Sequence, residues 1–531
     1  MPQPAVPKTL EIKDSRFTVR LLNTVEWLGN LLPHPVTLFA ILMLLIVVLS
    51  AVAAYFGLQV DDPRPVGAAG RAADGTVAVI SLLNTEGLLR ILSSLVSNFT
   101  SFAPLGTVLV TMLGVGIAEK SGLLSAAMRG MVIGAHPRIV TYIIVFAGVM
   151  SNTAGDLGYV VLIPMAAMIF HSLGRHPLAG LAAAFAGVSA GYGANLVLGT
   201  LDPLLAGIST AAAQLVDPNY VVSAEMNWYF MASSTVLLSI VGALVTEKLV
   251  EPKLGSYTAD AASESAPSPE LQLPTPTEIK GLKIAGIAFA LCAGLLAWAI
   301  LPEGALLRDP RTGSLAPLHN SMVAIIFMFF AIPGLAYGYV VGTIRNDRDA
   351  IHAMSDAMRS LSLYLVLIFF AAQFVTFFKW TNFGSVIAVL GADFLQSTGL
   401  TGPGVFFLFI IMCALINLMV GSSSAQWALT APIFVPMLML IGFAPETTQA
   451  AYRIGDSVTN IVTPMMSYFG LIVAMAAKYN KNIGLGTLIA MMLPYSVVFM
   501  VCWSVFFYVW TFVLGLPVGP GAATYYPVLA R

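Results

Sequence analysis

Runs of about 20 mostly apolar residues recur along this chain, and they constrain its fold more than any other feature. A helix of that length spans the hydrocarbon core of a bilayer. A run at 450–476 is long enough but contains Arg453 and Asp456, and an amphipathic segment at 81–101 is left open between a span and an interfacial helix. The other runs of this length lie near 36–58, 102–119, 177–200, 226–247, 280–302, 320–343, 361–378 and 486–515.

Charged residues are too scarce for most of the chain to face water. They make up 10% of the 531 residues, whereas about 25% is usual in a soluble domain. We therefore predict an all-α polytopic membrane protein with about nine transmembrane helices. The net charge of −1 gives no reason to expect a nucleic-acid partner. Cys292, Cys413 and Cys502 lie in apolar runs, which indicates buried thiols rather than a disulfide framework or metal cluster.

Two further apolar stretches, 138–172 and 403–440, are interrupted in the middle by small and polar residues. The interruptions are Ser151-Asn152-Thr153-Ala154-Gly155 and Gly421-Ser422-Ser423-Ser424. Two spans and a turn need at least about 42 residues, but these stretches contain 35 and 38. We predict two re-entrant helical hairpins, whose tips face a protein-lined cavity because lipid cannot satisfy free backbone groups.

Basic residues are distributed unevenly about the predicted spans. With a cytoplasmic N-terminus, most Lys and Arg residues fall on the cytoplasmic side, as the positive-inside rule requires. The C-terminus is then periplasmic, and the two hairpins open to opposite faces. The predicted organisation is a cytoplasmic or interfacial segment (1–35), a first half (36–250), a flexible cytoplasmic linker rich in Pro, Ser and Glu (251–279) and a second half (280–531).

The two halves share a weak repeat. Thirteen residues separate Ser151 from Pro164, and thirteen separate Ser423 from Pro436. Downstream, Pro177, Ala182-Ala183, Gly187 and Ser189 match Pro445, Ala450-Ala451, Gly455 and Ser457 at identical spacing. Because the hairpins face opposite sides, this is an inverted-topology repeat. Such repeats with broken helices place a substrate site near the bilayer midplane, where the repeats meet.

Motifs typical of enzymes and nucleotide-binding proteins are either absent from the sequence or lack the structural surroundings that they need. There is no P-loop and no H-E-x-x-H. Gly187 to Gly191 fits the G-x-S-x-G nucleophile elbow, but that motif needs a strand, a turn and a His base, and all six His residues lie at predicted span ends or loops. We expect no enzyme and no cofactor, so energy comes from an ion or substrate gradient. Paired hairpins favour alternating access over an ion channel with symmetric filter loops.

Arg453 and Asp456 are the most unusual residues in the apolar part of the chain. A charge at the membrane centre costs about 2.5–3.5 kcal/mol even on the lenient insertion scale. The two residues lie three apart on one helix, so they share a face and can pair as a structural salt bridge. The functional alternative is that Arg453 binds a carboxylate and Asp456 holds a proton or a cation. The Ser, Thr, Asn and Pro residues that follow, up to Pro464, favour a helix break.

Polar residues at the two hairpin tips form the second group of candidates. Ser422, Ser423 and Ser424 offer hydroxyls to a small cation or carboxylate, and Trp427 can stack on an aromatic ring or pack at the interface. On the other side stand Asn152, Thr153 and Asn195, together with Asp202 (a coupling carboxylate or a solvated helix end) and Asp156 (a helix cap or an ion contact). We expect the coupling ion to be a proton, held by Asp456, Asp202 or Asp156, or sodium near Ser423, Asn460 and Asp456.

Four long motifs carry a resemblance to a known family. They are MSNTAGDLGYVVLIPMAAMIF (150–170), GRHPLAGLAAAFAGVSAGYGANLVLGTLDPLLAG (174–207), GSSSAQWALTAPIFVPMLML (421–440) and AAYRIGDSVTNIVTPMMSYF (450–469). In this order they resemble the AbgT family, named for aminobenzoyl-glutamate transport, some of whose members are described as sulfonamide efflux pumps. The resemblance implies a homodimer with nine spans and two re-entrant hairpins per protomer. It also implies that Ser424, Trp427, Pro445, Arg453, Asp456, Pro464 and Asp202 matter for transport.

Residue chemistry and resemblance together predict a secondary transporter of the bacterial inner membrane. Its expected substrates are p-aminobenzoyl-glutamate and related antimetabolites such as sulfonamides, moved by an ion gradient. Arg453 suits the glutamate carboxylate, while Trp427 weakly favours an aryl group. The alternative is a transporter of another small carboxylate, such as a dicarboxylate, with a similar hairpin fold. The sequence leaves the direction of transport open.

Overall fold

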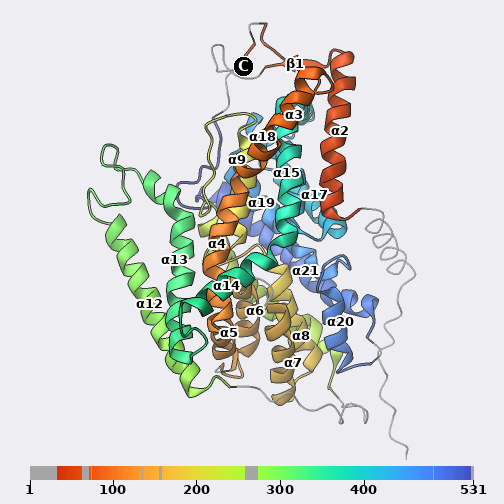
Figure 1. Ribbon diagram of the computed structural model, residues 1–531. Helices are drawn as coiled ribbons and strands as arrows, with labels where there is room; N and C mark the ends of the chain where they lie inside the picture. Colours follow the sequence, from red (N-terminus) through yellow and green to blue (C-terminus); the bar gives the residue numbers. More distant parts are fainter. Residues whose placement is uncertain are drawn as a thin grey trace, which may run out of the picture.

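The computed structural model is built almost entirely from helices (Figure 1). It describes residues 33–62, 71–72, 74–133, 135–154, 158–257, 273–481 and 483–527. Most of the predicted interfacial helix at 15–35 and of the linker at 251–279 lies outside these residues. Within them, the only strands are β1 (Gln59–Asp61) and β2 (Thr76–Ala78), which pair antiparallel with Gln59 opposite Ala78.

The helices of the first half follow the chain in this order: α2 Pro35–Tyr55, α3 Thr85–Thr100, α4 Ala103–Lys120, α5 Leu123–Ile133, α6 Val140–Ser151, η1 Asn152–Ala154, η2 Gly158–Leu162, α7 Ile163–Ser172, α8 Pro177–Phe185, η3 Ala186–Ala190, α9 Leu201–Ala213, α10 Trp228–Val245, η4 Thr246–Val250 and α11 Glu251–Leu254. The second half contains α12 Pro276–Ile300, α13 Ala316–Val341, α14 Asp347–Ser360, α15 Ser362–Trp380, α16 Phe383–Ser397, α17 Val405–Val420, α18 Ser423–Leu440, α19 Pro445–Val458, η5 Asn460–Val462, α20 Phe469–Ala477, α21 Leu485–Tyr508 and η6 Val509–Val513.

Eight helices in the described part are long and apolar enough to cross a membrane. The predicted spans near 36–58, 102–119, 226–247, 280–302, 320–343, 361–378 and 486–515 each fall on one of them. The remaining one is α18, the second arm of the second predicted hairpin. The segment 81–101, for which the sequence allowed either a span or an interfacial helix, contains α3. Together α3 and α4 form one candidate membrane span of 36 residues. At 1.5 Å per residue this is about 54 Å, well beyond the roughly 30 Å of a hydrocarbon core.

Two of the predicted spans, 177–200 and 450–476, are not continuous helices. The prediction of an unbroken span was wrong for 177–200. There the helix stops at Ala190, and Gly191–Thr200 is non-helical up to the start of α9. In 450–476, α19 ends at Val458 and α20 begins at Phe469, so the break falls where the Ser, Thr, Asn and Pro residues predict it. Counting apolar residues could not reveal the first break. Gly191, Gly193 and Gly199 interrupt a helix without adding polar side chains.

One edge of the molecule is a pair of long helices, α12 and α13, with α4 packed against α13 (Figure 1). Small residues permit the close approach of α4 to α13: a Cβ added at Gly114 would lie 2.5 Å from the carbonyl oxygen of Phe327, and one at Gly334 would lie 2.8 Å from Cα of Ala118. The outer side of α12 is apolar and exposed, with Leu291 63% and Leu295 66% exposed. Such a face is stable in lipid but not in water.

The two predicted hairpins pack against the two broken helices in the same way. The first arm of the first hairpin, α6, meets η3 where a Cβ on Gly187 would lie 2.4 Å from the carbonyl oxygen of Val145. The first arm of the second, α17, meets α19 where a Cβ on Gly455 would lie 2.5 Å from the carbonyl oxygen of Ile410. Gly187 and Gly455 are partners in the predicted repeat. The shared contact explains why glycine stands at both positions.

Replacing Gly455 with valine is therefore expected to loosen the contact between α17 and α19. The new side chain meets Ile410 and Cys413, and overpacking of this kind costs about 1–3 kcal/mol or more. Thermal unfolding of the purified protein in detergent measures the effect, and we expect a lower apparent Tm. Gly470→Val is the matched control, because a Cβ there meets nothing within 4 Å. Equal apparent Tm values for the two variants would contradict the packing argument.

Candidate functional site

The two segments that interrupt the broken helices, 191–200 and 459–468, lie against each other. The backbone N–H of Gly193 donates to Oγ of Ser457 at 2.8 Å, and Nδ2 of Asn460 donates to the carbonyl oxygen of Ser189 at 3.3 Å. Ser189 and Ser457 are partners in the predicted repeat, and each contacts the broken segment of the other half. The breaks therefore meet at one place, as the repeat predicts, and leave backbone groups free for other partners.

Arg453 occupies the centre of this meeting point and is completely buried. Its Nη2 lies 2.7 Å from Oδ1 of Asp202, and its Nη1 donates to the carbonyl oxygen of Gly193 at 3.3 Å. The second carboxylate oxygen of Asp202 accepts the N–H of Gly199 at 2.7 Å. Nε of Arg453 is buried and has no hydrogen-bond partner among the residues that the structure describes. The guanidinium thus bridges the two halves of the chain and keeps one donor uncommitted.

Of the two alternatives for Arg453 and Asp456, the structural salt bridge between them is not formed. Asp202, at the start of α9, reaches Arg453 instead, and it is 2% exposed rather than a solvated helix end. Asp456 is turned toward the second hairpin, where its Oδ1 lies 3.1 Å from the hydroxyl of Tyr452. The same hydroxyl donates to the carbonyl oxygen of Ser423 at 2.6 Å. A shared helix face allows an ion pair, but it does not exclude a better partner from another helix.

Asn417 is a polar residue at this site that the sequence reading missed. Its Nδ2 lies 2.5 Å from the carbonyl oxygen of Asp456, 2.9 Å from Oγ1 of Thr459 and 2.8 Å from Oδ1 of Asn460. Its Oδ1 is buried and has no partner. The available signal was an asparagine within the apolar run LINLM of the first hairpin arm. Amide, hydroxyl and carbonyl oxygens gathered in this way suit a hard cation.

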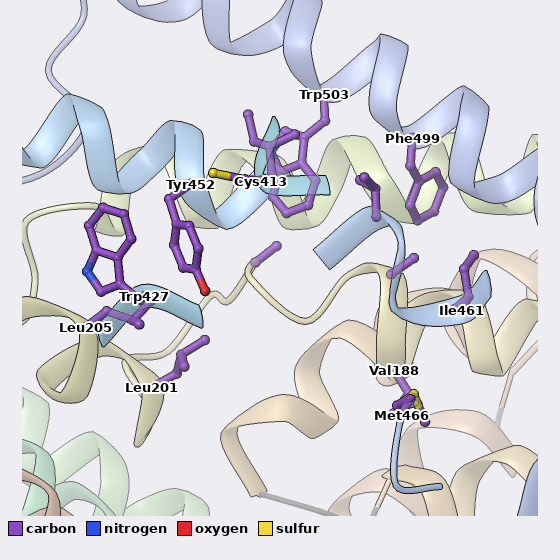
Figure 2. Packing of buried hydrophobic residues seen from close by; sticks show 14 of the residues in the cluster. Val188, Leu201, Leu205, Cys413, Trp427, Tyr452, Ile461, Met466, Phe499 and Trp503 are labelled. Atoms are coloured by element: carbon purple, nitrogen blue, oxygen red, sulfur yellow. The ribbon is translucent and has the colours of Figure 1, made fainter. Parts of the chain in front are cut away.

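Trp427 does not face an open pocket. Its indole is fully buried and stacks on the ring of Tyr452, with centroids 4.3 Å apart, as Figure 2 shows. Its Nε1 donates to Oγ of Ser209 at 3.0 Å, and Ser209 in turn donates to Gln449 at 2.5 Å. The predicted stacking on a substrate ring is therefore not available in this conformation, since Tyr452 covers one face of the indole. Ser209, Gln449 and Tyr452 were not singled out from the sequence.

A chain of hydrogen bonds continues from Gln449 toward the loop between α9 and α10. Gln449 donates to Asn227, and Asn227 donates to the backbone carbonyl of Glu446. The hydroxyl of Tyr220 lies 2.9 Å from the Glu446 carboxylate. Burial, and to a lesser degree the neighbouring Glu446, raise the pKa of Tyr220, which keeps this phenol protonated as a donor. The chain anchors Trp427 to a network that crosses both halves of the protein.

The remaining predicted residues occupy mixed positions. Asn152 is 5% exposed and donates to the carbonyl oxygen of Gly191 at 3.4 Å, while Thr153 bonds within its own hairpin arm to Met150. Asn195 is 2% exposed, and its Oδ1 has no partner. The rest are placed as follows: Ser424 and Pro464 are half-buried at the second tip and in the second break, Pro445 is the buried first residue of α19, and Asp156 lies outside the described residues.

Among the described residues no group of three or more His, Cys, Asp or Glu side chains is placed to hold a metal ion. The structure brings together one buried guanidinium, a paired carboxylate at Asp202, and a second carboxylate at Asp456, which lies beside the hydroxyl of Tyr452.

Comparison with known proteins gives this geometry its context. The model of the AbgT putative transporter family matches residues 20–526. The chain belongs to the AbgT family. It is 39% identical over 513 residues to the p-aminobenzoyl-glutamate transport protein of Escherichia coli (strain K12), covering 96% of this chain and 98% of that protein.

Two solved structures of other AbgT proteins are similar over nearly the whole chain. Neisseria gonorrhoeae MtrF, described as illuminating a class of antimetabolite efflux pumps, is 60% identical, with a TM-score of 0.89 over 95% of this chain and 100% of that one. The Alcanivorax borkumensis YdaH transporter, described as having an unusual topology, is 44% identical, with a TM-score of 0.83 over 92% and 100%. The predicted family and the helical multi-pass membrane fold are confirmed, and relatives of this AbgT transporter are named as transport proteins.

The ion pair at the centre predicts strong coupling between its two residues. Removing one partner of a buried pair leaves an uncompensated charge and costs about 3–5 kcal/mol. We expect Asp202→Asn and Arg453→Gln each to lower the apparent Tm markedly. The double variant should lose much less than the sum of the two, because it leaves no unpaired charge. Additive losses in thermal unfolding would show that the two side chains do not interact.

Proposed function

We propose that this AbgT transporter is an ion-gradient-driven carrier that moves p-aminobenzoyl-glutamate, or related antimetabolites such as sulfonamides, across the bacterial inner membrane. The observation that carries the proposal is the buried Arg453, whose only ion-pair partner in the described part is a carboxylate of the other half. A substrate carboxylate can take the place of Asp202 beside this guanidinium. The name of the Escherichia coli relative supports an aminobenzoyl-glutamate substrate.

Asp202 gives the exchange a means of coupling. When Asp202 takes up a proton, its attraction for Arg453 falls, and the guanidinium is free to hold a substrate carboxylate. When the substrate leaves, Asp202 releases the proton and pairs again. Binding of a proton to Asp202 therefore favours binding of substrate to Arg453, and binding of substrate favours binding of the proton. Such mutual stabilisation is the thermodynamic requirement for coupled transport.

Asp456 is the second coupling group. Burial disfavours the charged form of a carboxylate, and in this proposal Asp456 holds either a proton or a metal cation during transport. Thr459 and Asn460, which follow Asp456 closely in the chain, carry side-chain oxygens of the kind that a hard cation prefers, and they support sodium as the alternative to a proton.

Alternating access would come from movement of one part of the protein against another. The moving unit contains both hairpins with α8 and α19, and the scaffold contains α4, α12 and α13. In this proposal the hairpins are re-entrant, the N-terminus is cytoplasmic, the C-terminus is periplasmic, and two protomers form a homodimer. The opposite directions of the two repeats support this scheme.

The test of the proposal is uptake of labelled p-aminobenzoyl-glutamate by proteoliposomes under a proton or a sodium gradient, imposed one at a time. We expect Arg453→Ala to lower uptake by about tenfold or more, since a charge-assisted contact is worth at least about 1.4 kcal/mol. Asp456→Asn should abolish gradient-driven accumulation but keep exchange of substrate across the membrane. Arg359→Ala is the control, because that side chain is 76% exposed. Wild-type uptake by both site variants would refute the assignment, and competition by dicarboxylates alone would favour the other small-carboxylate transporter.

The identity of the ion can be separated from the identity of the substrate. Asn417→Leu removes amide groups beside Asp456 without changing any charge. If sodium binds there, we expect the sodium concentration for half-maximal uptake to rise by about tenfold, which corresponds to about 1.4 kcal/mol. If a proton is the coupling ion, uptake should depend on the pH gradient and not on sodium in either protein.

A further inference from the structure

A cavity of about 330 Å³ lies between the tip of the first hairpin and the helices α5, α12 and α13. This volume is near the lower end of the roughly 300–1,000 Å³ typical of small-molecule sites. The walls are mostly apolar and include three methionines and three phenylalanines, and we refer to it as the aryl cavity. Its principal wall residues are Met128, Met131, Met150, Phe289, Phe329 and Phe330.

The wall of the aryl cavity suits an aromatic ring. Phe289 and Phe329 meet edge to face, with centroids 5.1 Å apart, and fix one side of the cavity. Methionine sulfur contacts ring edges favourably, at about 0.3–1.5 kcal/mol each. The site identified around Arg453 offers no comparable place, because the indole of Trp427 is already stacked on Tyr452 and bonded to Ser209.

Polar groups lie at the tip end of this cavity. Ser151 and Thr153 line it, and Asn152 stands between them in the chain. The hydroxyl oxygens of Ser151 and Thr153 can accept hydrogen bonds, so a ligand that brings N–H donors to this end of the cavity finds acceptors there.

The aryl cavity is within reach of Arg453. Val197 lines the cavity, and the carbonyl of Gly193, four residues earlier in the same non-helical segment, accepts a hydrogen bond from Arg453. Four residues span at most about 14 Å. A single molecule with an arene at one end and a carboxylate at the other can therefore contact both places.

We propose that the aryl cavity binds the 4-aminophenyl group of the substrate, with the arylamine directed to the hairpin tip and any carboxylate to Arg453. This assignment rests on the proposed function. The 4-aminophenyl ring is the part that p-aminobenzoyl-glutamate and sulfonamides have in common, whereas only the former carries carboxylates. A shared arene subsite and a separate carboxylate subsite allow one carrier to recognise both.

Two glycines on α12 provide a matched pair of variants. Gly286 lines the aryl cavity and Gly294 does not, and a Cβ added at either meets nothing within 4 Å. The substitution Gly286→Phe fills the cavity, whereas Gly294→Phe adds a side chain of the same size outside it. Neither change removes a helix-forming residue, so both variants should fold.

The experiment measures binding of p-aminobenzoyl-glutamate and of sulfanilamide to purified transporter in nanodiscs. We expect Gly286→Phe to weaken both ligands by about tenfold or more, and Gly294→Phe to change them by less than about twofold. Arg453→Ala should weaken p-aminobenzoyl-glutamate more than it weakens sulfanilamide, because only the former carries a carboxylate. Thr153→Val should reduce the preference for p-aminobenzoyl-glutamate over N-benzoyl-glutamate, which lacks the amine.

A photolabel on the wild-type protein tests the same assignment without any substitution. Irradiated 4-azidobenzoyl-glutamate should mark peptides of α5, α12 or α13. Labelling confined to residues 423–458 would overturn the assignment, and so would equal ligand binding by Gly286→Phe and the wild type. The cavity would then be a place for lipid chains and not for substrate. Failure of the wild type to bind p-aminobenzoyl-glutamate, with sulfanilamide binding still sensitive to Gly286→Phe, would instead refute the proposed substrate and retain the subsite.

Discussion

The ion pair between Arg453 of α19 and Asp202 of α9 joins the two halves of this AbgT transporter beside the breaks in the two helices. A fully buried guanidinium is tolerable only with a nearby carboxylate and with further acceptors for its donors. Asp202 and the backbone carbonyl of Gly193 supply these for its two terminal nitrogens, and both depend on the break at 191–200. The interruption of the first broken helix is therefore what allows the second broken helix to carry a charge inside the membrane.

This arrangement ties stability to function. The same pair that holds the halves together is the one that a substrate carboxylate would have to open. A strong pair secures the folded protein but competes with the substrate. A carrier needs such a bistable contact, since a site that bound substrate without a competing partner would have no reason to change state.

Much of the architecture could be predicted from the sequence because lipid imposes simple rules. Run length predicted most of the spans, and the matched spacing of Gly187 and Gly455 predicted the repeat, whose close packing the structure displays. The re-entrant nature of the hairpins stays a prediction. The break after Ala190 was missed because glycines leave the apolar count high. Local rules also offered Asp456 as a partner for Arg453, which pairs with Asp202 instead. An i, i+3 neighbour is visible in the sequence, whereas a partner 251 residues away becomes visible only when the halves pack.

The same reasoning explains why Trp427 was considered as a ligand platform and why Asn417 was missed. A tryptophan near a polar tip looks like a ligand platform, but tertiary packing covered it with Tyr452 and anchored it through Ser209. An asparagine within an apolar run looks like an isolated polar residue, but Thr459 and Asn460 of the break and the backbone carbonyl of Asp456 supplied it with three oxygen neighbours. In both cases the deciding contacts come from segments that meet only because two helices end inside the protein. Side-chain roles in such a carrier therefore follow from where the breaks lie, and the breaks are encoded by glycine and proline more than by polarity.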